Sequence, residues 1–599
     1  MKLNVQLTQA TAFFTLLLLY TAGFPAWAGP AIDKITIDKE SAAKIVSTYS
    51  DKKKFTKEKI QDFTDFLSAI SQNKNYQQYS PFIDSYLTEK SLSQDNQKII
   101  FRLLGLYTSI KYGDQAIELL KTLVNFPTFK PKKIDQHNNP SMIKMGKKLA
   151  DVAKEFNLHF KNIDNRVFEI TLGGEKKDVI AVHAHGDVLP ANKDLWQLED
   201  GTQLDPFTVT TIGNRMYGRG TEDDKNGIVV SLFAMKVIRE ENLPRLNTLR
   251  LLVDTTEESG SSIPYYLSKY PTPPYNLALD GSYPIVIAEK GYGVVMANFP
   301  VRKGRGTGAE IISLTGGLAT NQIPKAATAT LHTANSSATT PTQLKRLKTK
   351  IDHLARPYIA THGGNFSIRT TEDGKQLRLS VIGVSAHSSQ PKSGVNPVSR
   401  LLDFIVHMRQ TLDIKANHIT DAAQYAADNW GLDYKGNKLG IGYRHEFMGP
   451  LTAALTYIHL DKNTLQLAVN LRIPEGKALE VLKKEITEKI SNWKLSQNKT
   501  MQVDYRFSKP MYRNPKGKWV NALLDIASEN LGIERKFGSS AGGTSIHNLP
   551  NGVQFGLSVP EVKYSGHNAN EFKTIDQFLL DLQIVTEALV TLGNLTELQ

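Results

Sequence analysis

The sequence contains no cysteine among its 599 residues. This absence excludes a disulfide scaffold, so the stability of the fold has to come from packing. It also excludes thiol nucleophiles and thiolate metal ligands, which leaves His and carboxylate side chains as the ligands for any metal ion. Such a ligand set suits zinc, manganese or cobalt.

Long apolar runs are also missing beyond the N-terminal segment. Lys2 precedes the apolar stretch 10–20, and Ala26–Ala28 has the small-x-small form of a signal-peptidase site. We predict a signal peptide over residues 1–28, with an uncleaved anchor as the alternative. No later stretch reaches the roughly 18 apolar residues of a membrane span. We therefore expect an exported protein, periplasmic or secreted, without membrane insertion after cleavage.

Nucleic-acid-binding motifs are absent too, although the formal net charge is +13. The Lys and Arg residues are scattered, apart from short clusters such as Lys52–Lys54 and 345–350, and a solvated surface explains them. We expect no nucleic-acid partner. With 40% hydrophobic and 22% charged residues, the chain has the composition of a globular protein, and its length requires several domains.

The residue pattern predicts an α/β fold with additional parts. Residues 29–125 have helical spacing, clearest at 99–110, and indicate a helical N-terminal extension. In 126–299, helices alternate with continuous apolar strands such as "DVIAVHAHG", which is typical of a mostly parallel central sheet. Shorter strands and Gly/Thr/Ser-rich loops in 300–505 predict an inserted α+β domain. The α/β pattern then returns in 506–599, the second part of the first domain.

His and Asp side chains follow the first of these predicted strands. His185 and Asp187 in "VHAHGDVLP" point to the same side if the strand geometry continues, although such a pair alone is usually structural. Asp223 and Asp224 in "GRGTEDDKNG" could begin a helix as capping residues, or one of them could bridge two cations. Ionised carboxylates are costly to bury unless they are paired or bind a metal, so these motifs point to a cation.

More acidic residues follow later strands. Glu257 and Glu258 in "TTEESGS" repel each other unless a cation is present or one takes a proton, so one could bind a metal while the other transfers protons. A solvated loop is the alternative. Asp280 closes "NLALDGSYP", and His567 lies in "YSGHNANEF". Ligands bind beyond the carboxyl ends of strands in such sheets, which makes a two-metal site plausible. Its candidate ligands are His185, Asp223, Glu258, Asp280 and His567.

The order of the motifs resembles that of a known family. The chain carries, in this order, "HGDVLP", "MYGRGTEDDKNG", "TTEESGS", "LDGSYP", "GVSAHSSQPKSGVNPV" and "SGHNANEF". This series resembles that of the di-zinc exopeptidase family that includes carnosinase, PepV-type bacterial dipeptidase, glutamate carboxypeptidase and aminoacylase. The resemblance covers residues 120–599. It implies a zinc-peptidase catalytic domain, with residues 300–505 as the inserted lid domain.

The resemblance also implies a metal site. His185 would bind one divalent ion and His567 the other, and Asp223 would bridge the two. Glu258 would complete the ligands of one ion and Asp280 those of the other. The ions would be zinc, with manganese or cobalt as alternatives. In this family the peptide bond that follows the bridging Asp is typically cis.

Further roles follow from the same resemblance. Glu257 would be the general base and acid acting on the bridging water, and Asp187 would orient the neighbouring His ligand. His387 in "SAHSSQP" would stabilise the oxyanion of the tetrahedral intermediate. Arg472 in "VNLRIP" would grip the substrate's free carboxylate, a bidentate task that suits a guanidinium group. Asn396 is a further candidate for substrate binding.

We predict an exported metallopeptidase that hydrolyses dipeptides or short peptides with a free N-terminus. In the family, Asp at position 280 is typical of dipeptidases and aminopeptidases, whereas Glu at this position is typical of carboxypeptidases and deacylases. An N-acyl-amino-acid deacylase or carboxypeptidase is the alternative, and an inactive peptide-binding module is a third possibility, disfavoured by the intact glutamate pair. A lid long enough to supply His387 from the same chain predicts a monomer. Asn226 replaces the family's usual Gly after Asp-Asp-Lys, and because Asn tolerates positive φ, we expect the loop to be retained.

Overall fold

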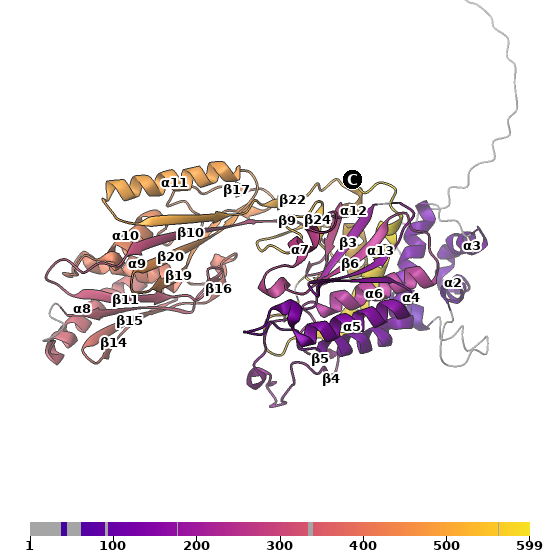
Figure 1. The fold of residues 1–599 in the computed structure, drawn as a ribbon, viewed down its shortest axis with the longest axis horizontal. Coiled ribbons are helices and arrows are strands. Elements are labelled where there is room, and N and C mark those ends of the chain that lie inside the picture. The colour runs from indigo at the N-terminus through magenta and orange to yellow at the C-terminus, as the bar shows by residue number, and fades with distance from the viewer. Residues whose placement is uncertain (1–36, 45–61, 90–93, 177, 334–338, 561) are drawn as a thin grey trace, which may run out of the picture.

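The computed structural model describes residues 37–44, 62–89, 94–176, 178–333, 339–560 and 562–599, so the predicted signal peptide lies outside it. Figure 1 shows two bodies side by side, each built on its own sheet. In the described part of the chain, no helix is both long and apolar enough to cross a membrane.

The first body contains a nine-stranded sheet in the order β1-β2-β6-β3-β7-β24-β9-β22, with β23 also paired to β9. Its strands are β1 (His159–Ile163), β2 (Val167–Leu172), β3 (Val179–His185), β6 (Thr248–Asp254), β7 (Tyr275–Ala278), β9 (Val286–Glu289), β22 (Met511–Tyr512), β23 (Gly538–Ser540) and β24 (Gly552–Gln554). The central strands β6, β3, β7 and β24 are parallel, whereas β1, β2 and β22 pair antiparallel with their neighbours. Strand β9 pairs antiparallel with β24 and β22 and parallel with β23. The predicted α/β fold is confirmed, and the sheet is mixed around a parallel centre.

Helices surround this sheet, and three of them, α2, α3 and α4, come from the predicted N-terminal extension. They are α2 (Phe63–Ser71), α3 (Ser80–Glu89), α4 (Gln94–Val124), α5 (Pro140–Glu155), α6 (Lys225–Glu240), α7 (Ile263–Leu267), α12 (Lys518–Leu531) and α13 (Ile575–Asn594). Helix α4 packs on α6 and α13, and its apolar residues belong to the main core cluster. The residues of α4 itself are apolar or small around much of the helix, which is typical of a buried helix. The chain therefore has no domain boundary at residue 125.

The second body is the inserted α+β domain. Its eight-stranded antiparallel sheet comprises β10 (Gly291–Pro300), β11 (Glu310–Gly316), β13 (Ala326–His332), β14 (Ser367–Asp373), β15 (Gln376–Ile382), β19 (Thr452–Leu460), β20 (Thr464–Ile473) and β21 (Gln502–Phe507). The helices α8 (Pro341–Thr361), α9 (Pro397–Arg409), α10 (His418–Asn429) and α11 (Leu479–Ser496) share a separate hydrophobic core with it. Because β10 belongs to this sheet, the chain leaves the first sheet at Gly291 rather than at the predicted residue 300.

The two bodies are joined where the chain crosses between the sheets twice. Strand β9 leads through Lys290 into β10, and β21 returns to β22. The two crossings pair with each other on both sides of the junction, since β10 pairs with β21 and β9 with β22. Between them, Ser508 N–H donates to the carbonyl oxygen of Tyr292 at 2.7 Å. The junction is thus a two-stranded connection.

A short three-stranded sheet and three short strand pairs complete the described fold. They are β4 (Thr210–Ile212) and β5 (Arg215–Tyr217) with β26 (Phe572–Thr574), β8 (Gly281–Ser282) with β25 (Leu557–Ser558), β12 (Gln322–Ile323) with β16 (Ala386–His387), and β17 (Arg444–His445) with β18 (Gly449–Pro450). The β26–β5 pair brings the C-terminal "SGHNANEF" segment next to the "GRGTEDDKNG" loop. These segments are more than 300 residues apart in the sequence, and each carries candidate ligands.

Candidate metal centre

The carboxyl ends of three neighbouring parallel strands supply the first candidate ligands. His185 is the last residue of β3 and lies opposite Asp254 at the end of β6. Glu257 and Glu258 follow β6 in a short 3-10 helix, and Asp280 follows β7. Because β6, β3 and β7 are adjacent, their ends meet at one edge of the sheet. The strand order therefore explains why residues far apart in sequence share one site.

Asp223 lies between the two histidines. Its Oδ1 is 2.8 Å from His185 Nε2, and its Oδ2 is 2.9 Å from His567 Nε2. The His567 ring nitrogen is also 3.1 Å from Glu258 Oε2, and the His185 Nε2 is 3.9 Å from Asp280 Oδ2. All five predicted ligands therefore converge in two half-sites that share Asp223. The peptide bond between Asp223 and Asp224 is cis, as the resemblance implies.

The donor atoms fit one divalent ion in each half-site. Two donors that share a tetrahedral zinc ion at about 2.0–2.1 Å lie about 3.3 Å apart, and the observed distances lie on both sides of that value. Within the described residues, candidate donors come within 4.8 Å of one another in two groups: His185, Glu257 and Asp280, and Asp223, Glu258 and His567. Imidazole and carboxylate donors suit zinc, manganese or cobalt.

The site carries a large excess of buried negative charge. Burial raises the pKa of Glu257 to about 8, and burial together with the charge of Asp223 raises the pKa of Asp280 to about 6. Burial also raises the pKa of Asp224 well above its usual range. Hydrogen bonds to Asp223 and Glu258 raise the pKa of His567 to about 10. The pKa values of the carboxyl groups are thus raised by burial and then by neighbouring carboxylates, and the pKa of His567 is raised by its carboxylate partners. Divalent ions would supply the positive charge that stabilises these carboxylates in their ionised form.

Asp187 has a different set of partners from the one that the sequence suggests. Its carboxylate accepts hydrogen bonds from the backbone N–H groups of Glu257 at 3.0 Å and Glu258 at 3.1 Å. The Nδ1 of His185 is 2.9 Å from the backbone oxygen of Asp187 and 3.6 Å from its carboxylate. The backbone carbonyl thus orients the imidazole more closely than the side chain does, and the side chain positions both glutamates.

Glu571 is a positioning residue that the sequence did not reveal. Its Oε1 accepts hydrogen bonds from the N–H groups of Gly220, Glu222 and Asp223, and its Oε2 accepts one from Arg219 Nη1 at 2.6 Å. The side chain is fully buried. Glu571 therefore fixes the loop that carries the bridging carboxylate. The only sequence signal was its place in "SGHNANEF", four residues after His567.

A comparison with known protein families agrees with a metal centre at these residues. A model of Peptidase family M20/M25/M40 matches residues 181–591, which include all five candidate ligands. The chain belongs to this family. It is a metallopeptidase, as the sequence predicts.

Curated relatives named dipeptidases match about three quarters of this chain. The putative dipeptidase YtjP of Bacillus subtilis (strain 168) is 27% identical over 449 residues, 74% of this chain and 89% of the relative. The Beta-Ala-Xaa dipeptidase of Lactobacillus delbrueckii subsp. lactis is 26% identical over 459 residues, 75% of this chain and 89% of its own. The crystal structure of human carnosine dipeptidase 1 is 13% identical and has a TM-score of 0.47, covering 83% of this chain and 99% of its own.

Two predicted residues of the peptidase lie in the lid. His387 is exposed at the end of β16, and its Nδ1 is 2.6 Å from Ser389 Oγ. Arg472 in β20 is buried and donates from Nη1 to the carbonyl oxygen of Ala541 in the catalytic domain at 3.2 Å. Burial, and then the charge of Arg472, lower the pKa of His387. In the described residues, neither side chain has a hydrogen bond or ion pair with the metal-ligand cluster.

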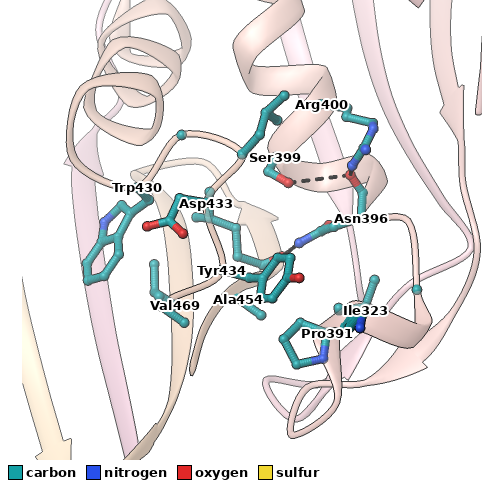
Figure 2. Close-up of a pocket in the computed structure, with 16 residues that line it drawn as sticks. Ile323, Pro391, Asn396, Ser399, Arg400, Trp430, Asp433, Tyr434, Ala454 and Val469 are labelled. Atoms are coloured by element: carbon teal, nitrogen blue, oxygen red, sulfur yellow. Dashed lines mark hydrogen bonds between the residues drawn. The ribbon is translucent and has the colours of Figure 1, made fainter. Parts of the chain in front are cut away.

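Asn396 has a structural role in the lid of the peptidase. Its Oδ1 accepts a hydrogen bond from Val398 N–H at 3.0 Å and so caps α9, while its Nδ2 donates to the carbonyl oxygen of Leu455 at 2.6 Å. Figure 2 shows it beside Ser399 and Tyr434 in a small pocket within the lid. This pocket is lined by lid residues alone and contains none of the five metal-site candidates. The structure thus gives Asn396 a capping role, and its role in substrate binding stays a prediction.

The loop around Asn226 also differs from the expectation. Asn226 lies in the first turn of α6, and it is not among the described non-Gly residues with positive φ. Its side chain is buried, and Nδ2 has no hydrogen-bond partner. The replacement of the family's Gly is therefore accommodated by helical backbone.

Proposed function

We propose that this metallopeptidase hydrolyses dipeptides or short peptides with a free N-terminus at a centre that holds two divalent ions. The observation that carries the proposal is the position of Asp223, whose two oxygens face His185 and His567 from opposite sides of one carboxylate. Two ions held there would act as Lewis acids on the scissile carbonyl and lower the pKa of water. The relatives named dipeptidases support the substrate class.

Glu257 is the general base and acid in this proposal. Its carboxylate lies among the donors of the first half-site, and its backbone N–H is held by Asp187. A carboxylate in this place can take the proton of the attacking water and deliver it to the leaving amine. In the lid, His387 would stabilise the oxyanion, and Arg472 would hold the substrate carboxylate once the substrate lies between the two bodies.

The test replaces Glu257 with Gln. Loss of a general base costs about 100-fold or more in kcat, and because the ligand set is unchanged, we expect metal content measured by atomic emission to stay at the wild-type value. Glu199→Gln, in an exposed turn, is the matched control and keeps full activity. A Glu257→Gln enzyme with wild-type turnover would remove Glu257 from the mechanism.

The substrate class needs a separate assay. The zinc- and manganese-loaded wild-type protein is tested on a panel of unblocked dipeptides and on N-acyl amino acids. We expect hydrolysis of unblocked dipeptides. Cleavage of the N-acyl amino acids alone would instead identify the protein as a deacylase, and stoichiometric peptide binding without turnover would identify a binding module.

We also propose that the enzyme is exported and acts as a monomer. The apolar stretch 10–20 and Ala26–Ala28 support export, and a lid that carries His387 in the same chain supports the monomer. N-terminal sequencing of the protein from the fractionated producing cells should give Gly29 as the first residue, and sedimentation should give the monomer mass of the cleaved chain. An intact N-terminus in the cytoplasmic fraction would contradict export.

A further inference from the structure

A tyrosine contacts the bridging carboxylate. The hydroxyl of Tyr564 donates a hydrogen bond to Asp223 Oδ2 at 2.6 Å. This is the oxygen that faces His567 at 2.9 Å, whereas Oδ1 faces His185 at 2.8 Å. The phenol therefore acts on the half-site of His567 and Glu258 and makes no hydrogen bond to the other one.

The loop around Tyr564 is built to hold this hydroxyl in place. The N–H and the hydroxyl of Ser565 both donate to Glu222 Oε2, next to the bridging residue in sequence. The Tyr564 side chain folds back over its own loop and lies against Gly566. A Cβ atom added at Gly566 would be 2.3 Å from the phenol oxygen and 2.4 Å from Cζ. Only a residue without Cβ leaves room for the ring there. The contact between Tyr564 and Asp223 is thus held by the Ser565–Glu222 hydrogen bonds and by the packing of the ring on Gly566.

A hydrogen bond of this kind has a definite effect on a metal ligand. Hydrogen bonds with an ionised partner are short and about twice as strong as neutral ones, so the phenol restricts rotation of the carboxylate. Groups that orient metal ligands from outside typically change metal affinity by about 10- to 100-fold when they are removed. Asp223 serves both half-sites, but the phenol contacts only one of its oxygens.

We propose that Tyr564 is a positioning residue for the second divalent ion, holding Asp223 Oδ2 where it and His567 close that half-site. The inference rests on the two-metal site of the proposed function, and it adds a residue that acts on one ion and not on the other.

The test is a stepwise metal titration of the apo protein. Zinc binding is followed by competition with a chromophoric chelator, and His567→Ala identifies the binding step of the second half-site by its loss. In Tyr564→Phe we expect that step to weaken by about 10- to 100-fold while the other step keeps its wild-type affinity. Tyr512→Phe is the matched control, since Tyr512 is 41% exposed against 38% for Tyr564 and contacts no candidate ligand. It should leave both steps unchanged.

Gly566→Ala provides a second, independent variant. Its added Cβ displaces the phenol without removing it, so it should weaken the same step as Tyr564→Phe. The proposal is overturned if both steps keep their wild-type affinity in Tyr564→Phe, or if both weaken equally. Because the titration uses no substrate, its result is independent of the activity assays. A protein that binds two ions but hydrolyses no dipeptide would refute the proposed function alone.

Discussion

Replacement of Glu571 with Gln is expected to destabilise the loop that carries the bridging carboxylate. Glu571 Oε1 accepts three backbone hydrogen bonds, from Gly220 at 2.9 Å, Glu222 at 3.0 Å and Asp223 at 3.2 Å, and Oε2 accepts the fourth from Arg219. The amide of Gln keeps one oxygen for the backbone groups. Its NH2 group, however, would face the guanidinium of Arg219. Two hydrogen-bond donors would then lie against each other, where Arg219 now donates to Oε2 of Glu571.

The size of the effect follows from burial. Arg219 is 4% exposed and Glu571 fully buried, so the substitution leaves a buried cation without its acid. Removal of one partner from a buried ion pair costs about 3–5 kcal/mol. A large domain loses about 2 °C of melting temperature per kcal/mol, so we expect the catalytic domain to melt about 6–10 °C lower.

The assay is calorimetry of the zinc-loaded protein. Glu597→Gln is the control, since Glu597 pairs with Lys518 on the surface, and its melting temperature should match that of the wild type. Adding Arg219→Met to Glu571→Gln removes the unpaired cation and should recover part of the lost stability. The reasoning is refuted if Glu571→Gln melts with the wild type, or if the double variant is less stable by the sum of the single effects.

Two further predictions concern buried lysines. Lys225 Nζ donates to the carbonyl oxygens of Leu123 at 2.9 Å and Phe126 at 2.7 Å. Because Lys225→Met leaves both acceptors unpaired, it should lower the free energy of unfolding, measured with urea, by about 2–6 kcal/mol. An unchanged midpoint of urea unfolding would contradict a structural role for the contact between Lys225 and the end of α4. Burial, and then two neighbouring arginines, lower the pKa of Lys290 to about 8. The folded state then binds fewer protons than the unfolded state between about pH 8 and 10.4, so stability should rise by about 3 kcal/mol across that interval. Lys290→Met should abolish this rise in melting temperature, and its persistence would assign it to other groups.

The convergence of the metal ligands could be predicted from sequence because it depends on strand ends. His185, Glu258 and Asp280 each follow a continuous apolar run, and such runs form the buried central strands of an α/β sheet. In the observed order β6-β3-β7 these strands are adjacent, so their carboxyl ends meet. Local sequence pattern and one topological rule therefore place these three ligands. Asp223 and His567 were candidates on the same grounds, and the family motifs agreed with both.

Other features depend on contacts that leave no local pattern. The carboxylates of Asp187 and Glu571 bind backbone N–H groups far away in sequence, and any residue except proline can supply an N–H. Helix α4 carries apolar residues on most of its surface, so its periodicity did not distinguish a core helix from an extension. Strands β9 and β10 are separated by Lys290 alone, and no change in composition marks the boundary at Gly291. Asn396 was a further candidate for substrate binding, and its hydrogen bond to Val398 N–H shows that it also caps α9.

The central claim is that one carboxylate joins two metal half-sites. The most direct measurement is a crystal structure of the zinc-soaked protein with data collected on both sides of the zinc absorption edge. We expect two anomalous peaks, one between His185 and Asp280 and one between His567 and Glu258, with an oxygen of Asp223 bound to each. A single peak, or two peaks without Asp223 between them, would contradict it.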